Sequence, residues 1–260
     1  MMGRIINANR SVVPACDFPL EVFEKLVKAT GDIAGIGGYK IGPALTGRPG
    51  YDSVIRVARE HTDKPLIFDP QKWGTDIPDT APNLLTPVKE AGFDAVIIFP
   101  ESGPATELSW IRAAQDLGLG VIVGGEMTHP RYLQGDVSNG RDLDYTTAFK
   151  LLGMRKQPTG FIRSDAPSEM YEVAARLGVE DFVVPGNKPD QILLYKGQLE
   201  FVVKGTPTFW SPGLVAQGGD ISEGARAAGR SFHAIVGRGI YRADDMRRAA
   251  EEHCSKLEAA

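Results

Sequence analysis

The alternation of short apolar runs with amphipathic stretches constrains the fold of this chain more than any other feature. Most of the runs are apolar almost throughout, which is typical of parallel strands buried on both faces. Stretches with helical spacing separate the runs, and several of these stretches end in glycine, as helices commonly do. The pattern predicts eight strands, at residues 11–17, 37–42, 65–69, 94–100, 120–126, 181–185, 208–212 and 232–238.

Eight strand–helix units in 260 residues match the number and size of a closed (β/α)8 barrel, or TIM barrel. We therefore predict an α/β fold in which residues 1–260 form a single barrel domain. An open, doubly wound parallel sheet is the alternative. Residues 131–165 interrupt the rhythm after the fifth strand, and we interpret them as an inserted segment with a short helix near 145–152. Such insertions are often lids or interface elements, although surface decoration fits equally well.

Composition and charge narrow the function classes. Apolar residues make up 42% of the chain and charged residues 24%, as in an ordinary globular enzyme. The formal net charge of -4 gives no general attraction to nucleic acid or to anionic membranes. We see no signal-like apolar start and no membrane-length apolar run, and Cys16 and Cys254 match no metal or redox spacing. We therefore expect a cytoplasmic protein with neither nucleic acid nor membrane as a partner.

Polar side chains cluster where the predicted strands end. In a barrel these ends meet on one rim, and that rim carries the chemistry. Any one of these residues alone could be a helix cap or a solvated loop charge. Their convergence instead predicts a charged site, built from Asp17, Lys40, Asp69, Lys72, Glu126, Thr128, Ser211 and Arg238.

Two glycine-rich stretches follow the last two predicted strands. They are "SPGLVAQGGD" at 211–220 and "GRGIY" at 237–241. The loops after strands seven and eight form the usual phosphate site of a barrel, because glycine lets backbone N–H groups approach an anion. Arg238 could add a bidentate contact. Together the two stretches favour a phosphorylated small molecule as the ligand, although each alone could be a tight turn.

These motifs resemble those of the orotidine 5'-phosphate decarboxylases of archaeal and bacterial type. The resemblance covers nearly the whole chain apart from the inserted segment. "SPGLVAQGGD" is similar to the family's phosphate-gripping loop, and "AIVGRGIYRADD" to its last strand with the phosphate-binding arginine. "ACDF", "YKIG" and "EMTHP" resemble the motifs of strands one, two and five. "DPQKWGTDIPDTA" resembles the catalytic signature Asp-x-Lys-x-x-Asp-Ile-x-x-Thr.

The resemblance implies a lyase of pyrimidine (UMP) biosynthesis that converts orotidine 5'-phosphate to UMP and CO2 without metal or cofactor. It implies a homodimer in which Asp76 and Thr80 complete the neighbouring site. The implied catalytic residues are Lys40, Asp69, Lys72 and Asp76. The implied substrate-binding residues are Asp17, Thr80, Thr128, Pro212, Gln217, Gly218, Gly237 and Arg238.

The catalytic signature departs from the family spacing. Lys72 follows Asp69 by three residues where the family has two, and Asp76 follows Lys72 by four where the family has three. On a strand, a step of two residues keeps both side chains on one face, and a step of three does not. We expect a bulge or turn at 70–71 that returns Lys72 to the mouth of the barrel.

Three other functions remain open. Metal-dependent sugar-phosphate enzymes of the same superfamily, the hexulose-phosphate synthases and keto-gulonate-phosphate decarboxylases, place an acidic metal ligand where this chain has Lys40, whose ammonium has no lone pair to offer. A non-catalytic nucleotide-binding homologue would explain the altered spacing. An aldolase with Lys72 as Schiff-base nucleophile is disfavoured, because flanking carboxylates raise the pKa of a lysine.

Overall fold

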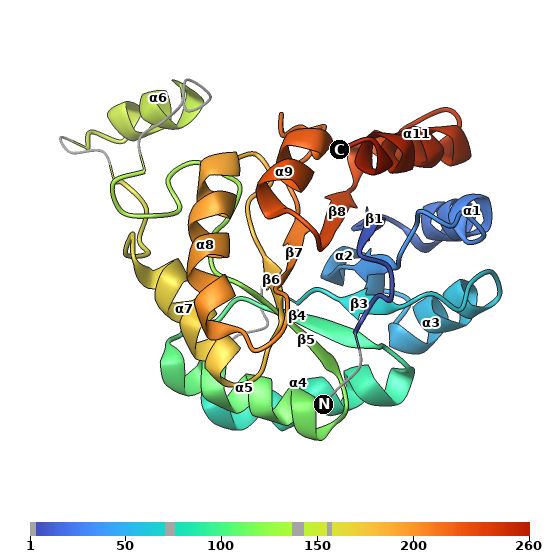
Figure 1. The fold of residues 1–260 in the computed structure, drawn as a ribbon, viewed down its shortest axis with the longest axis horizontal. Helices are drawn as coiled ribbons and strands as arrows, with labels where there is room; N and C mark the ends of the chain where they lie inside the picture. Colours follow the sequence, from blue (N-terminus) through green and yellow to red (C-terminus); the bar gives the residue numbers. More distant parts are fainter. Residues whose placement is uncertain (1–3, 71–75, 137–142, 155–157) are drawn as a thin grey trace.

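The computed structural model describes residues 4–70, 76–136, 143–154 and 158–260. Eight parallel strands close into a barrel in chain order, with β1 paired to β8 (Figure 1). The predicted (β/α)8 barrel is therefore confirmed, and the open sheet is excluded. All eight predicted strands are present; the first has the expected length but begins one residue earlier, and the other seven are shorter than expected. They are β1 Arg10–Cys16, β2 Tyr39–Ile41, β3 Leu66–Phe68, β4 Ala95–Ile98, β5 Gly120–Gly124, β6 Asp181–Val183, β7 Thr208–Ser211 and β8 Phe232–Val236.

Helices surround the barrel and follow the strands in the expected alternation (Figure 1). In the described parts of the chain, no helix is both long and apolar enough to cross a membrane. The helices are α1 Leu20–Thr30, α2 Pro43–Thr46, α3 Tyr51–Arg59, the 3-10 helix η1 Pro78–Thr80, α4 Ala81–Ala91, α5 Pro104–Asp116, α6 Leu143–Leu151, α7 Ala166–Arg176, α8 Pro189–Val202, α9 Ile221–Ala228, α10 Arg238–Tyr241 and α11 Met246–Glu258.

The apolar strand residues are divided between two cores. In β4, Val96 and Ile98 pack outward in the cluster that includes the helices, whereas Ala95 and Ile97 belong to the cluster inside the barrel. This two-sided burial explains why the strands have nearly continuous apolar sequences. Large side chains such as Trp210 fill the interior, so the barrel is a packed core rather than a pore. A ligand site must therefore be built on the rim.

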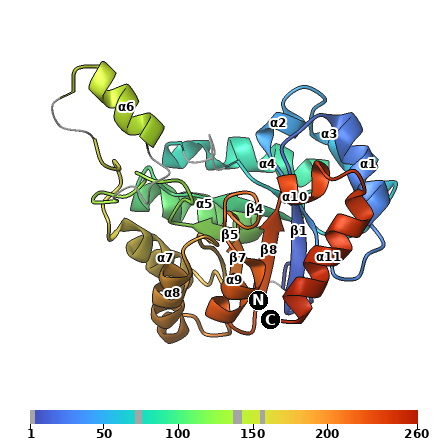
Figure 2. The ribbon, with the colours of Figure 1, turned by 90° about the horizontal axis from the view of Figure 1, so that it is seen from above.

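The segment 131–165 carries α6 away from the ring of helices (Figures 1 and 2). The helix expected near 145–152 is present as α6. The base of the segment is closed by a bridge between Leu133 and Ile162. Arg131 adds a hydrogen bond of 2.7 Å to the carbonyl of Pro158. These contacts bring the two ends of the segment together beside the barrel rim.

Candidate active site

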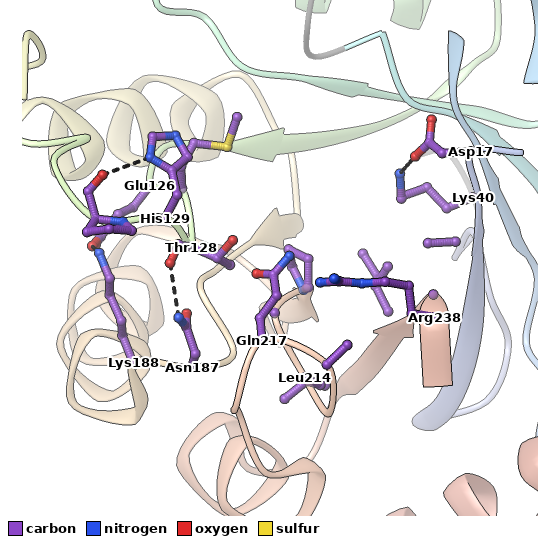
Figure 3. Close-up of a pocket in the computed structure, with 18 of the residues that line it drawn as sticks. Asp17, Lys40, Glu126, Thr128, His129, Asn187, Lys188, Leu214, Gln217 and Arg238 are labelled. Carbon is purple, nitrogen blue, oxygen red and sulfur yellow. Dashed lines mark hydrogen bonds and ion pairs between the residues drawn. The ribbon is translucent and has the colours of Figure 1, made fainter. Parts of the chain in front are cut away.

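A cavity of about 580 Å³ opens at the rim formed by the carboxyl ends of the strands. Its walls come from the ends of β1, β2, β5, β7 and β8 and from the loop after β6 (Figure 3). Eight residues predicted from the sequence line this cavity: Asp17, Lys40, Glu126, Thr128, Pro212, Gln217, Gly237 and Arg238. The structure thus brings both glycine-rich loops and the first charged strand ends to one space.

Lys40 is the centre of a buried charge cluster on one wall. Its ammonium donates a hydrogen bond to the carboxylate of Asp69 and lies 3.5 Å from Asp17 Oδ2 (Figure 3). Lys40 is 6% exposed and Asp69 2%. Burial alone would lower the pKa of Lys40, but the two carboxylates reverse this, so that its pKa lies above the ordinary lysine value. The cluster therefore holds a fixed positive charge at the cavity wall.

Backbone pairing of the strands explains why Lys40, Asp17 and Asp69 lie close together. Lys40 lies opposite Ala15 of β1 and Ile67 of β3, and the Asp69 N–H donates to the Ile41 carbonyl, so all three chain segments end at the same level. Gly42 makes room for Asp17, since a Cβ atom there would lie 1.8 Å from Asp17 Oδ1. That oxygen is buried and accepts no hydrogen bond from the described residues. It is an acceptor without a donor at the edge of the site.

The loop between β7 and α9 forms the facing wall. It folds back on itself, with Val215 N donating to the Gly219 carbonyl at 2.8 Å and Gly218 N to the Val215 carbonyl at 3.1 Å. Gly218 has a φ of 88°, a conformation that glycine adopts without strain. Gln217 of this loop points toward Arg238, which begins α10, across the cavity in Figure 3. Arg238 thus lies across the cavity from the glycine-rich loop, and its guanidinium and the Gln217 amide are N–H donors of the kind that hold an anion.

A second buried charge cluster lies at the end of β5. Glu126 is 2% exposed and accepts hydrogen bonds from Lys188 Nζ at 2.7 Å and from the Tyr195 hydroxyl. Lys188 also lies 3.6 Å from Asp136 in the inserted segment. The sequence placed Glu126 on the rim but did not single out the other three residues. Lys188 follows β6, so it could have been predicted as a rim residue from its place at a strand end. The contact of Tyr195 depends on how α8 packs and could not.

Asn187 connects three rim loops. Its Nδ2 donates to the Thr128 carbonyl at 3.0 Å (Figure 3), while its Oδ1 is buried and unpartnered among the described residues. The Thr128 methyl group packs against Gly213, where an added Cβ atom would lie only 2.7 Å away. The loops after β5, β6 and β7 are thus held against one another, and the sequence did not predict this role for Asn187.

The comparisons with known proteins agree with this geometry. The family model described as "Orotidine 5'-phosphate decarboxylase / HUMPS family" matches residues 11–253. The chain belongs to this family. It is 29% identical over 237 residues to the orotidine 5'-phosphate decarboxylase of Methanosarcina barkeri, covering 91% of this chain and 90% of that protein. It is 28% identical over 199 residues to the enzyme of the same name from Pyrococcus abyssi, covering 76% of each.

Solved structures with family names share the fold. The orotidine 5'-phosphate decarboxylase of Pyrococcus horikoshii superposes with a TM-score of 0.68 at 25% identity, covering 96% of this chain and 100% of that one. The orotidine 5'-monophosphate decarboxylase of Methanocaldococcus jannaschii, complexed with the inhibitor BMP, gives a TM-score of 0.73 at 21% identity, covering 95% and 98%. The second likeness shows the fold alone.

The other residues of the predicted catalytic and substrate-binding sets do not line the described rim cavity. Asp69 lies behind Lys40 rather than on the described cavity wall, and Gly218 follows the lining residue Gln217. Asp76 and Thr80 lie just before α4, where they bond to Ile77 and do not line the cavity of their own chain as far as it is described. Lys72 and the second residue of the expected turn at 70–71 lie outside the described residues.

Proposed function

We propose that the chain is an orotidine 5'-phosphate decarboxylase, a metal- and cofactor-independent lyase that forms UMP and CO2. One observation carries the proposal: a cavity of about 580 Å³ has Lys40, paired with Asp69 behind it, on one wall and Arg238 with the glycine loop on another. The match to the family along residues 11–253 supports it. The family description also covers another branch, but a lysine at position 40 does not suit a metal ligand.

The walls suit the three parts of the proposed substrate. Arg238 and Gln217 would hold the phosphate, as a guanidinium and an amide donor can. Asp17, whose Oδ1 lacks a donor, would accept a hydrogen bond from a ribose hydroxyl, and Lys40 would donate one. Thr128 would then lie beside the pyrimidine, held by Asn187. Holding the phosphate far from the reacting carbon lets binding energy contribute to the rate, and not only to affinity.

The proposed reaction needs only the charges of side chains and one proton from a lysine. The bond between C6 and the carboxylate breaks, CO2 leaves, and the electron pair stays on C6. Asp69 would lie near the substrate carboxylate and disfavour it in the ground state by like-charge repulsion. Lys72 would stabilise the negative charge at C6 and then donate its proton there. Lys40, bonded to Asp69, would hold that carboxylate in position.

We further propose a homodimer in which Asp76 and Thr80 complete the neighbouring cavity. Both residues lie outside their own cavity wall, and Asp76 is exposed in the single chain. Sedimentation of the protein, with mixing of Lys72→Ala and Asp76→Ala chains, tests the arrangement. Two inactive variants that regain part of the activity on mixing would support shared sites, since one site in a mixed dimer would be intact. A cytoplasmic location stays a prediction.

The activity itself is tested by the loss of orotidine 5'-phosphate absorbance with purified protein in EDTA. The proposal predicts turnover that Lys72→Ala abolishes. Turnover that stops in EDTA and returns with Mg²⁺ would favour the sugar-phosphate branch. Binding of UMP without any turnover would favour a non-catalytic homologue.

A further inference from the structure

A second cavity lies outside the rim site and shares no lining residue with it. Its volume is about 260 Å³, and it opens between the start of α5, the face of α7 and the chain just before α7. α5 and α7 are neighbours in the ring of helices (Figures 1 and 2). Nothing in the proposed decarboxylation uses this space, so its side chains need a separate explanation.

The unusual group in this cavity is the carboxyl of Glu107. Glu107 is in the first turn and a half of α5 and is 2% exposed, on the same buried face as Trp110 and Ile111. Its Oε1 is buried and has no hydrogen-bond partner among the residues that the structure describes. Burial raises the pKa of Glu107 to about 8. A buried carboxyl oxygen without a partner is costly, and such an exception in a folded protein calls for an explanation.

The other charged groups around the cavity leave an excess of acid. Arg163 is already engaged, with one nitrogen 2.5 Å from Glu169 Oε2 and another 3.6 Å from Asp165. Glu101 accepts a hydrogen bond from the Tyr132 hydroxyl, which carries no charge to balance it. The described lining thus holds Glu101, Glu107 and Glu169 against the single cation Arg163, which favours a cation rather than an anion as the ligand.

The remaining walls are apolar. They suit a ligand with a hydrocarbon chain. The ring of Phe161 is 89% exposed, and such a chain could cover it. The cavity is slightly smaller than the usual range for drug-sized ligands, roughly 300–1,000 Å³, so its occupant is small. The apolar lining residues are Pro100, Pro104, Phe161, Ile162, Ala166, Met170 and Val173.

We propose that this cavity binds a primary amine on a short alkyl chain, with the ammonium against Glu107 and the chain along Met170 and Val173. An ammonium has three donors, so it can satisfy the unpartnered oxygen and balance its charge at once. Binding moves a proton: Glu107 gives up its carboxyl proton to the solvent and the amine stays an ammonium. The inference is independent of the proposed decarboxylation.

Proton release makes the affinity depend on pH. Below pH 8 the Glu107 proton must leave, so the affinity rises about tenfold per pH unit from pH 6 to pH 8. It then levels off until the free amine itself loses its proton near pH 10. The other titratable groups around the cavity are Glu101, Glu169 and Arg163 in its lining, with Asp165 and Tyr132 bonded to them.

The test is calorimetric titration of the full chain with n-pentylamine hydrochloride at pH 7, in two buffers of different ionisation enthalpy. The proposal predicts binding with release of nearly one proton, and at least tenfold weaker binding by Glu107→Gln. The matched control is Glu169→Gln, whose exposed side chain already pairs with Arg163, and it should bind within about twofold of the wild type. 1-Pentanol, which has the chain but no charge, should bind at least tenfold more weakly than the amine.

Three results would overturn the proposal: no binding of the amine, equal binding by Glu107→Gln, or binding without proton release. If Glu107→Gln fails to fold, the proton release measured with the wild type still tests whether the amine binds against an ionising Glu107. Decarboxylation is measured on the same samples. Because Glu107 does not line the rim cavity, Glu107→Gln should turn over orotidine 5'-phosphate at the wild-type rate, so failure of one proposal is not mistaken for failure of the other.

Discussion

Asp69 and Glu107 are two equally buried carboxyl groups, each 2% exposed, in opposite situations. Asp69 receives a hydrogen bond from the Lys40 ammonium, whereas Glu107 Oε1 has no partner within the described parts of the chain. The first pair holds two opposite charges at the wall of the rim cavity, and their attraction raises the pKa of Lys40. At Glu107 desolvation acts unopposed and raises the carboxyl pKa to about 8. The two carboxyl groups differ in their partners and not in their depth of burial.

The largest effect is expected from breaking the first pair. Lys40→Met leaves Asp69 buried without its cation, which should cost about 3–5 kcal/mol of unfolding free energy. We expect kcat/KM for orotidine 5'-phosphate to fall by on the order of 10³-fold or more, because the charge at the site is lost. Urea unfolding and turnover measure the two effects. The double variant Lys40→Met/Asp69→Asn should recover much of the stability and none of the turnover. Recovery of turnover would contradict a role for the pair in the reaction.

Arg238 is expected to show the next largest effect. Arg238→Ala removes the cation that faces the glycine loop, and kcat/KM should fall by roughly 10²-fold, mostly through KM. Arg242→Ala is the matched control, because Arg242 lies beyond the cavity wall near the ring of Tyr241, and it should stay within about twofold. Orotidine without its phosphate should be turned over equally by wild type and Arg238→Ala. A matching loss with orotidine would place Arg238 away from the phosphate.

A smaller effect is expected at Asn187, which links the loops after β5 and β6. Asn187→Ala removes the hydrogen bond to the Thr128 carbonyl, worth about 1 kcal/mol, so kcat/KM should fall about fivefold. Steady-state kinetics measure the change. Asn187→Asp is the informative comparison, because a carboxylate cannot donate to the carbonyl and should not restore activity. A fully active Asn187→Asp would show that this hydrogen bond does not position Thr128.

The smallest effect on turnover is expected at Glu107, where the prediction concerns stability and its pH dependence instead. Its folded pKa of about 8 lies above the ordinary value, so the protonated folded state is favoured at low pH and this stability is lost as pH rises from about 4.5 to 8. Glu107→Gln carries no ionisable group. The rise in pKa from 4.5 to about 8 corresponds to about 5 kcal/mol, so the thermal midpoint of this variant should exceed that of the wild type by roughly 10 °C at pH 9. The difference should shrink toward pH 5. A pH-independent difference would mean that Glu107 is not a buried titrating acid.

The fold could be predicted from the sequence because each strand is buried on both faces, which leaves an unbroken apolar run that few other structures produce. Asp17, Lys40, Thr128 and Arg238 could be located because each is at or beside a strand end, and the rim brings such residues together. The position of the catalytic signature cannot be compared in the same way, because Lys72 lies outside the described residues. That a turn at 70–71 directs the Lys72 side chain to the barrel mouth stays a prediction.

Other functional contacts could not be predicted, because they arise only when elements pack. The Tyr195 hydroxyl donates a hydrogen bond to Glu126 from α8. The sequence of α8 predicts a helix but not this contact. Glu107 was hidden for a different reason. An acid in the first turns of a helix is normally an exposed partner of the helix dipole, and only the packing of α5 turns this one inward.

The most direct test of the account is the absorbance of orotidine 5'-phosphate followed with purified protein in EDTA, beside the Lys40→Met variant. The account predicts steady loss of absorbance by the wild type, stoichiometric CO2 release, and no detectable loss with Lys40→Met. Unchanged absorbance with the wild type, in a protein that still binds UMP in the rim cavity, would contradict it, because the charged wall would then serve binding alone.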